Sequence, residues 1–110
     1  MVARACARIA GSGGAVDIAS LVAAGGSSHR HFIALFRDQV GLTPKRFARL
    51  ARFEALLTAL RAGPTSRPAW AELAAALGYA DQSHLNRDVR RFAGVTPSRL
   101  PALLEPFGEG

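Results

Sequence analysis

The stretch GYADQSHLNRDVRRFAGVTPSRL, residues 78–100, decides the fold because it repeats a pattern that the 110-residue chain has already used. Its last seven residues, GVTPSRL at 94–100, follow the phrase GLTPKRF at 41–47 by 53 residues. The repeat extends further, with Leu21 matching Leu73, Gly26 matching Gly78, Phe32 matching Leu85, Phe36 matching Val89 and Arg37 matching Arg90. Chance rarely supplies matched apolar positions on both sides of a glycine turn. The sequence therefore predicts an internal duplication.

Each copy is predicted to be a helix, a glycine turn and a second helix. In the second copy Gly78 makes the turn and Asp81 caps the second helix. The expected inward positions of this copy are Trp70, Leu73, Ala74 and Leu77 before the turn and Leu85, Val89 and Phe92 after it. In the first copy Asp17 caps the first helix and Ser28 caps the second, which stops at Gly41. A short helix, VARACARIA, is expected before both copies.

A long helix is predicted between the copies, since Thr43 and Pro44 form an N-cap followed by a proline at the first helical position. About 18 residues at 1.5 Å each span roughly 27 Å. Its expected core stripe is Phe47, Leu50, Phe53 or Glu54, Leu57 and Leu60, with Lys45, Arg46, Arg49 and Arg52 on the other side.

The expected fold class is therefore all-α, with two homeodomain-like helix-turn-helix subdomains joined by a long linker helix. The expected boundaries are 1–62 for the first subdomain with its linker helix (44–62), 63–104 for the second subdomain, and 105–110 for a flexible tail.

The composition points to a polyanionic partner. The net charge is +6, from 14 Lys and Arg against 8 Asp and Glu, and Lys45 is the only lysine. Residues 29–61 carry seven of the cations and two acids. A basic balance of this kind favours nucleic acid or an anionic membrane surface.

Several other classes are disfavoured. The single cysteine, Cys6, excludes an intramolecular disulfide and disfavours a cysteine-based zinc site. His29 and His31 lie two apart, on different helical faces, so we expect no metal site. No paired carboxylates or activated serine indicate catalysis, and we expect neither an enzyme nor a cofactor. No apolar run approaches the roughly 18 residues of a membrane span, and no signal peptide is apparent, so a cytoplasmic protein is expected.

The second helix of the second copy carries a polar surface made of Gln82, Ser83, Asn86, Arg87 and Arg90, which are spaced one, three and four apart. Asparagine and glutamine can pair with adenine, and arginine with guanine. The alternative is a solvated helix face without a partner.

The chain from 17 to 100, and above all WAELAAALGYADQSHLNRDVRRFAGVTPSRL, resembles the C-terminal DNA-binding domain of AraC/XylS-type bacterial transcription regulators. The most specific part is 78–97, where the glycine, the following aromatic, QSH, the arginine, the phenylalanine and GVTP agree in spacing. The resemblance implies two recognition helices, 28–40 and 81–93, entering successive major grooves of an asymmetric site. It implies base contacts from Gln82, Ser83, Asn86 and Arg87 in the second copy and from Arg30, Ile33 and Ala34, with His29 nearby, in the first.

The first copy departs from the family pattern, because the family often has polar residues or arginine where this chain has Ile33 and Ala34. Both can touch a thymine methyl group, but neither can form bidentate hydrogen bonds. Weak specificity is therefore expected from this copy. Val89 stands where the family usually has phenylalanine, which predicts a smaller core contact.

Phosphate contacts are expected from arginines off the reading face and from the capped helix starts. The candidates are Arg37, Arg46, Arg49, Arg90, Arg91, Arg99, Thr43 and Thr96. The expected partner is double-stranded DNA, bound by a transcription regulator on the bacterial nucleoid. The resemblance further implies RNA polymerase and an N-terminal effector or dimerisation domain as partners. The alternative function is a basic helical module that binds an anionic membrane or a protein partner non-specifically.

Overall fold

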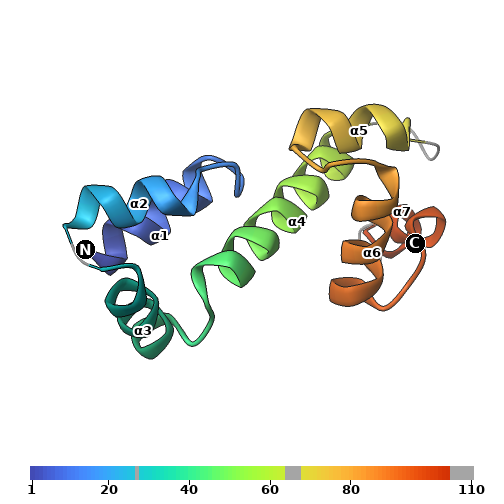
Figure 1. The fold of residues 1–110 in the computed structure, drawn as a ribbon. Coiled ribbons are helices and arrows are strands. Elements are labelled where there is room, and N and C mark those ends of the chain that lie inside the picture. The colour runs from blue at the N-terminus through green and yellow to red at the C-terminus, as the bar shows by residue number, and fades with distance from the viewer. Residues whose placement is uncertain (27, 64–67, 105–110) are drawn as a thin grey trace. The chain divides into compact units, whose positions relative to one another are not determined.

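The computed structural model describes residues 1–26, 28–63 and 68–104, and every regular element in these ranges is helical (Figure 1). The helices are α1 (Val2–Gly11), α2 (Ile18–Gly25), α3 (His29–Val40), α4 (Pro44–Ala62), α5 (Trp70–Leu77), α6 (Gln82–Ala93) and α7 (Leu100–Leu103), with the 3-10 turn η1 (Pro97–Arg99) before α7. The expected all-α fold is confirmed, with α2–α3 and α5–α6 as the two helix-turn-helix pairs. The predicted tail, 105–110, lies outside the described residues.

The chain divides into two compact units, a first unit of Met1–Arg52 and a second unit of Phe53–Gly110. The division falls inside α4, whereas the sequence-based boundary at 62 assigns that whole helix to the first subdomain. The difference has a physical cause, because Phe53 and Leu56 of α4 belong to the hydrophobic core of the second unit. The side chains of α4 therefore serve both cores.

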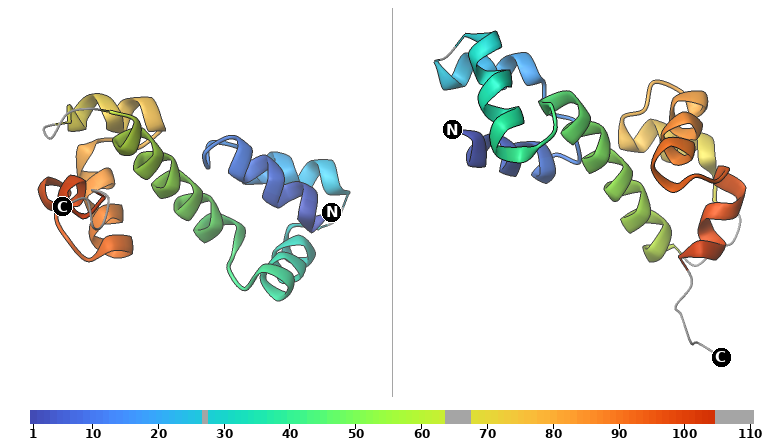
Figure 2. Two further views of the ribbon diagram at one scale, coloured as in Figure 1. Left: turned by 180° about the vertical axis from the view of Figure 1, so that it is seen from behind. Right: turned by 90° about the horizontal axis from the view of Figure 1, so that it is seen from below.

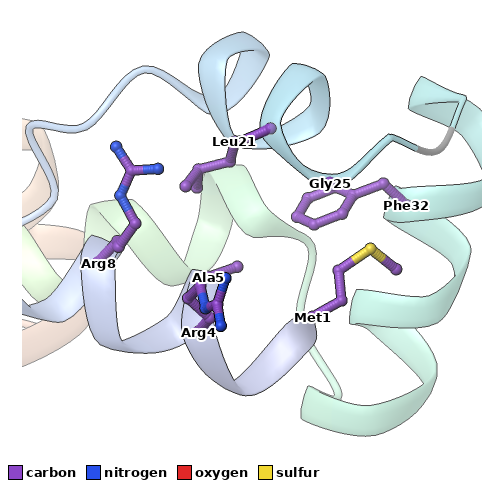
Figure 3. Close-up of a pocket in the computed structure, with 8 residues that line it drawn as sticks. Met1, Arg4, Ala5, Arg8, Leu21, Gly25 and Phe32 are labelled. Atoms are coloured by element: carbon purple, nitrogen blue, oxygen red, sulfur yellow. The ribbon is translucent and has the colours of Figure 1, made fainter.

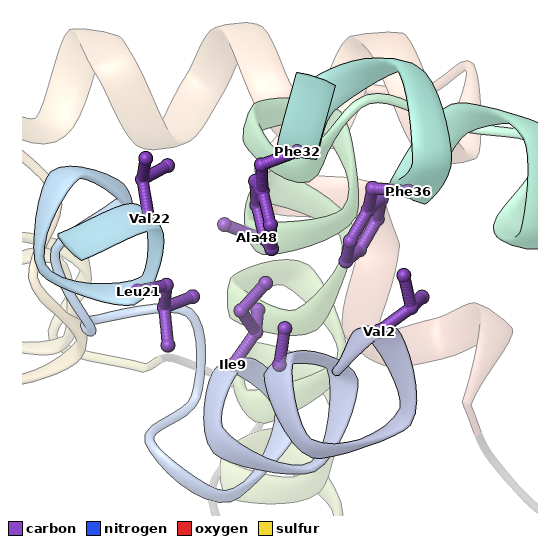
Figure 4. Close-up of a cluster of buried hydrophobic side chains, with 8 residues drawn as sticks. Val2, Ile9, Leu21, Val22, Phe32, Phe36 and Ala48 are labelled. Carbon is purple, nitrogen blue, oxygen red and sulfur yellow. The ribbon is translucent and has the colours of Figure 1, made fainter. Parts of the chain in front are cut away.

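The core of the first unit is built by four helices (Figure 4). Phe32 and Phe36 of α3 are almost fully buried, with ring centroids 5.9 Å apart, and both point toward side chains of α1 and α4. The buried members of this core are Val2, Ala5, Ile9, Leu21, Val22, Phe32, Phe36 and Ala48. Three of the eight come from α1, at i, i+3 and i+7, so this helix is a structural part of the unit.

The core of the second unit lies where α4, α5 and α6 meet. In Figure 1 α6 runs across the direction of α5, and Figure 2 shows both helices from two other sides. Its buried members are Phe53, Leu56, Ala74, Tyr79, Leu85, Val89 and Leu100. Phe53 is thus the inward residue of α4, and Glu54 is exposed. The prediction that Phe92 packs inward is wrong. It is 36% exposed at the rim of the core, with its ring 5.2 Å from that of Phe53.

The predicted helix starts are confirmed by hydrogen bonds from backbone amides to side chains. Asp17 Oδ1 accepts from the Ala19 amide at 3.3 Å, and Ser28 Oγ accepts from the His31 amide at 3.1 Å. Caps of this kind satisfy amides that have no partner inside the helix.

The second copy of the GxTP phrase behaves differently from the first. Thr43 Oγ1 accepts from the amide of Arg46 and opens the long helix α4. Thr96 makes no capping hydrogen bond with its side chain, and within the described residues up to 104 the 3-10 turn η1 and the four-residue α7 follow it. Pro101 explains the difference, because it has no amide hydrogen to donate to the carbonyl of Pro97, as an α-helical turn requires.

Candidate nucleic-acid interface

The turn that positions α6 is fixed by its own side chains. Gly78 adopts the left-handed conformation at φ 87°, which glycine tolerates best. Asp81 Oδ1 accepts from the His84 amide at 2.8 Å, and His84 Nδ1 accepts from the Ala80 amide at 3.2 Å. The ring of Tyr79 stands edge-on to that of His84, with centroids 5.1 Å apart. The imidazole of His84 therefore both packs and hydrogen-bonds at the turn before α6.

The outward face of α6 is polar and accessible. Its predicted base-reading residues Gln82, Ser83 and Arg87 are exposed, and so is Arg90. Leu85 and Val89, on the opposite side of the helix, are completely buried. The helix is therefore held by its apolar side, so that three hydrogen-bonding side chains near its start face away from the core.

Asn86 is less accessible than these neighbours. It is partly buried, and its Oδ1 atom is enclosed with no hydrogen-bond partner among the described residues. The sequence places Asn86 on the polar surface correctly but does not reveal this orientation.

Asp88 was not singled out from the sequence, although it is completely buried in the middle of α6. The available signal was its spacing three residues after Leu85, which puts the two residues on the same side of the helix.

The corresponding face of α3 in the first unit offers fewer polar groups. Arg30, His29 and Ala34 are exposed at the predicted positions. The sequence predicted that Ile33 faces outward, but its side chain is partly buried and packs against the first core. The cause is the width of the apolar side of α3, which extends from Phe32 and Phe36 to the neighbouring position. Of the predicted reading positions in this copy, only those three are fully available to a partner.

The predicted phosphate contacts fall into two groups. The exposed ones are Arg37, Arg46, Arg90, Arg91, Arg99 and Thr96. Arg49 and Thr43 are partly buried, and Thr43 already accepts the capping hydrogen bond from Arg46. Arg52, predicted on the same basic side of α4, donates from Nη2 to the carbonyl oxygen of Gly14 at 3.3 Å and so holds the loop before α2.

The whole net charge of the chain belongs to one unit. Residues 1–52 contain eight Lys and Arg and two Asp, which gives +6, whereas 53–110 contain six Arg and six Asp and Glu, which gives zero. The reading face of the neutral unit is rich in hydrogen-bonding groups, and that of the basic unit is poor in them. Charge and hydrogen-bonding capacity are thus divided between the two copies.

Other kinds of site are not indicated in the described part of the chain. No group of three or more His, Cys, Asp and Glu there is arranged to hold a metal ion. No helix in the described ranges is long and apolar enough to cross a membrane. Cys6 is a free cysteine, partly buried against the first core.

A family model described as a helix-turn-helix domain matches residues 21–101, which run from the middle of α2 through the second helix-turn-helix pair and include all of α3, α4, α5 and α6. Comparison with curated proteins gave no match, and neither did comparison with solved structures. The matched family is one of DNA-binding proteins and not of enzymes. It is the family that the repeated GxTP pattern and the polar face of α6 indicate. The chain therefore belongs to the AraC-type helix-turn-helix family, whose members bind double-stranded DNA and regulate transcription.

Proposed function

We propose that this protein is a sequence-specific transcription regulator in which α6 reads bases and the first unit supplies most of the electrostatic affinity. The observation that carries the proposal is the contrast between the two reading faces. Gln82, Ser83 and Arg87 are exposed on α6 while the core side of that helix is fully buried. Side chains of these types can form base-specific hydrogen bonds in a major groove. An anionic membrane would need only positive charge, which the second unit as a whole lacks.

The first unit plays the complementary role. With a net charge of +6, it can neutralise several phosphates, and release of their counterions favours binding to any DNA sequence. Its base contacts are Arg30 and His29, with Ala34 and the exposed part of Ile33 against thymine methyl groups. Exposed arginines of α3 and α4, among them Arg37 and Arg46, hold the backbone. This unit positions the protein and adds modest sequence preference.

Because the two copies differ in their outward residues, the proposed operator is asymmetric. The two recognition helices, residues 28–40 and 81–93, meet successive major grooves about 34 Å apart. Base contacts in the second groove come from Gln82, Ser83, Asn86 and Arg87, with Arg90, Arg91 and Arg99 on phosphates. The regulator would then act on RNA polymerase at the bacterial nucleoid, under an effector or dimerisation domain where one is attached.

The test is selection of binding sequences from a randomised duplex pool, followed by salt titration on the best sequence and on a scrambled one. We expect a strongly selected block under the second unit, a weaker block about one helical turn away, and a loss of about 10³-fold or more on scrambling. Both duplexes should show a steep decline of affinity with salt.

Two outcomes would contradict the proposal. Equal affinity for the selected and scrambled duplexes would show that α6 reads no bases. Binding to anionic vesicles as tight as to DNA, at the same ionic strength, would favour a general anion-binding module instead.

A further inference from the structure

The first unit contains a hollow that the proposed DNA contacts do not use. It has a volume of about 290 Å³ and lies between α1, the end of α2 and the start of α3 (Figure 3). Its lining residues are Met1, Arg4, Ala5, Arg8, Leu21, Ala24, Gly25 and Phe32. The volume is at the lower limit of small-ligand sites and corresponds to roughly ten liquid water molecules.

The hollow combines an apolar base with a cationic rim. Ala5, Leu21 and Phe32 are buried members of the first core, and part of each lines the hollow. Arg4 and Arg8 lie one turn apart on α1, and both are exposed. Neither guanidinium group makes an ion pair or a hydrogen bond with any residue in the described ranges. No acidic side chain lines the hollow, so nothing in its wall neutralises the two guanidinium groups.

Gly25 lines the hollow at a position where the backbone conformation does not require a glycine. The left-handed turn after α2 is made by Gly26, whereas Gly25 has no positive φ. A Cβ atom at Gly25 would lie 3.0 Å from Met1 Sδ, so the absence of a side chain lets Met1 approach α2 at the edge of the hollow.

We infer that this hollow binds a small carboxylate with a short apolar body. The guanidinium group of either Arg4 or Arg8 can form paired hydrogen bonds with the two oxygens of a carboxylate. The apolar body would lie against Leu21 and Phe32. Because Phe32 belongs to α3, the bound ligand would contact the same helix that presents Arg30 and Ala34 to DNA.

The test uses the full chain and three probes with one common body: 3-phenylpropanoate, the uncharged 3-phenylpropan-1-ol and 3-phenylpropylammonium. Amide chemical shifts are followed during each titration, since the phenyl ring shifts the signals of nearby residues. The expected result is saturable binding of the carboxylate alone, with the largest shifts at Ala24, Gly25 and Phe32. The double variant R4Q/R8Q should bind it at least about tenfold more weakly, and R61Q, an exposed arginine of the second unit, should bind it normally.

Three results would overturn the inference: no saturation by about 10 mM, equal binding of the alcohol, or unchanged binding by R4Q/R8Q. The DNA affinity of the same variants tests a second explanation, in which Arg4 and Arg8 contact DNA phosphates. If R4Q/R8Q loses affinity for every duplex while carboxylate binding is unaffected, the two arginines are phosphate contacts and the hollow is not a ligand site. A Gly25→Leu variant provides a further check, because its side chain should block carboxylate binding while α2 remains folded.

Discussion

His84 Nδ1 accepts a hydrogen bond from the backbone amide of Ala80 at 3.2 Å, across the turn that leads into α6. The backbone amide of His84 donates to Asp81 Oδ1, so the histidine stabilises the turn with both its side chain and its backbone. The start of the reading helix is thus fixed by contacts within five residues of sequence. Substitutions at the turn and on the reading face should therefore have separable effects.

The first prediction concerns this turn. His84→Ala removes the acceptor for the Ala80 amide and the edge-on contact with Tyr79, and should lower the free energy of unfolding by about 1 kcal/mol. Ser83→Ala, at the exposed neighbouring position, should change it by no more than about 0.5 kcal/mol. Urea denaturation of both variants checks the difference. Equal stabilities would show that the turn does not depend on the imidazole.

Arg87 should determine sequence selectivity. Arg87→Ala is expected to weaken binding to the selected operator by about 1 to 3 kcal/mol and to relax the preference at one base pair. Its effect on a scrambled duplex should be much smaller. Fluorescence anisotropy at fixed salt gives both values. Equal losses on the two duplexes would assign Arg87 to the phosphate backbone.

Arg46 should act through charge alone. Arg46→Gln is expected to reduce affinity on all duplexes alike and to lower the slope of log K against log salt by about 1. Arg61→Gln is the matched control, since Arg61 is also an exposed arginine of α4 but lies in the second unit. A control variant that lowers the slope as much as Arg46→Gln would contradict the assignment of the electrostatic affinity to the first unit.

Substitution of Asn86 should lower the affinity for the operator without lowering the stability of the fold. Its Oδ1 is enclosed without a hydrogen-bond partner in the described part of the chain, so Asn86→Ala removes a poorly placed acceptor and introduces a better helix former. We expect the free energy of unfolding to stay constant or to rise by up to about 1 kcal/mol, while operator affinity falls by about 1 to 3 kcal/mol. Thermal unfolding and anisotropy measure the two effects. A clear loss of stability would indicate that the side-chain oxygen has a structural role.

Gly14 and Gly26 should respond unequally to the same substitution. Both have positive φ, but a Cβ at Gly14 would overlap with the carbonyl oxygen of Ala48, whereas at Gly26 it would meet open space. Gly26→Ala should therefore cost about 1 to 2 kcal/mol for the left-handed conformation alone, and Gly14→Ala should cost more. Urea denaturation distinguishes the two. A Gly14→Ala cost no larger than that of Gly26→Ala would show that the loop before α2 can move away from α4.

The sequence by itself determined the helices from α1 to α6, four N-caps and the turn between each helix pair, although the cap expected at Thr96 does not form. Asp17, Ser28, Thr43 and Asp81 were identified as N-caps from residue type and position, and each caps as expected. These contacts join residues two or three apart, so they depend on the local chain and not on distant elements. The fold class could be predicted from the duplication for the same reason, since each copy of the helix-turn-helix pattern depends on residues that are close together in the sequence.

Tertiary structure alone decided which side chains of those helices remain accessible. The burial of Ile33 and Asp88, the exposure of Phe92 and the enclosed oxygen of Asn86 all depend on what packs against α3 and α6. Helical periodicity gives the direction of a side chain but not the width of the core that it meets. The same limit applies to α4, where a single apolar stripe supplies two cores and only the packing of Phe53 and Leu56 shows where the first unit ends.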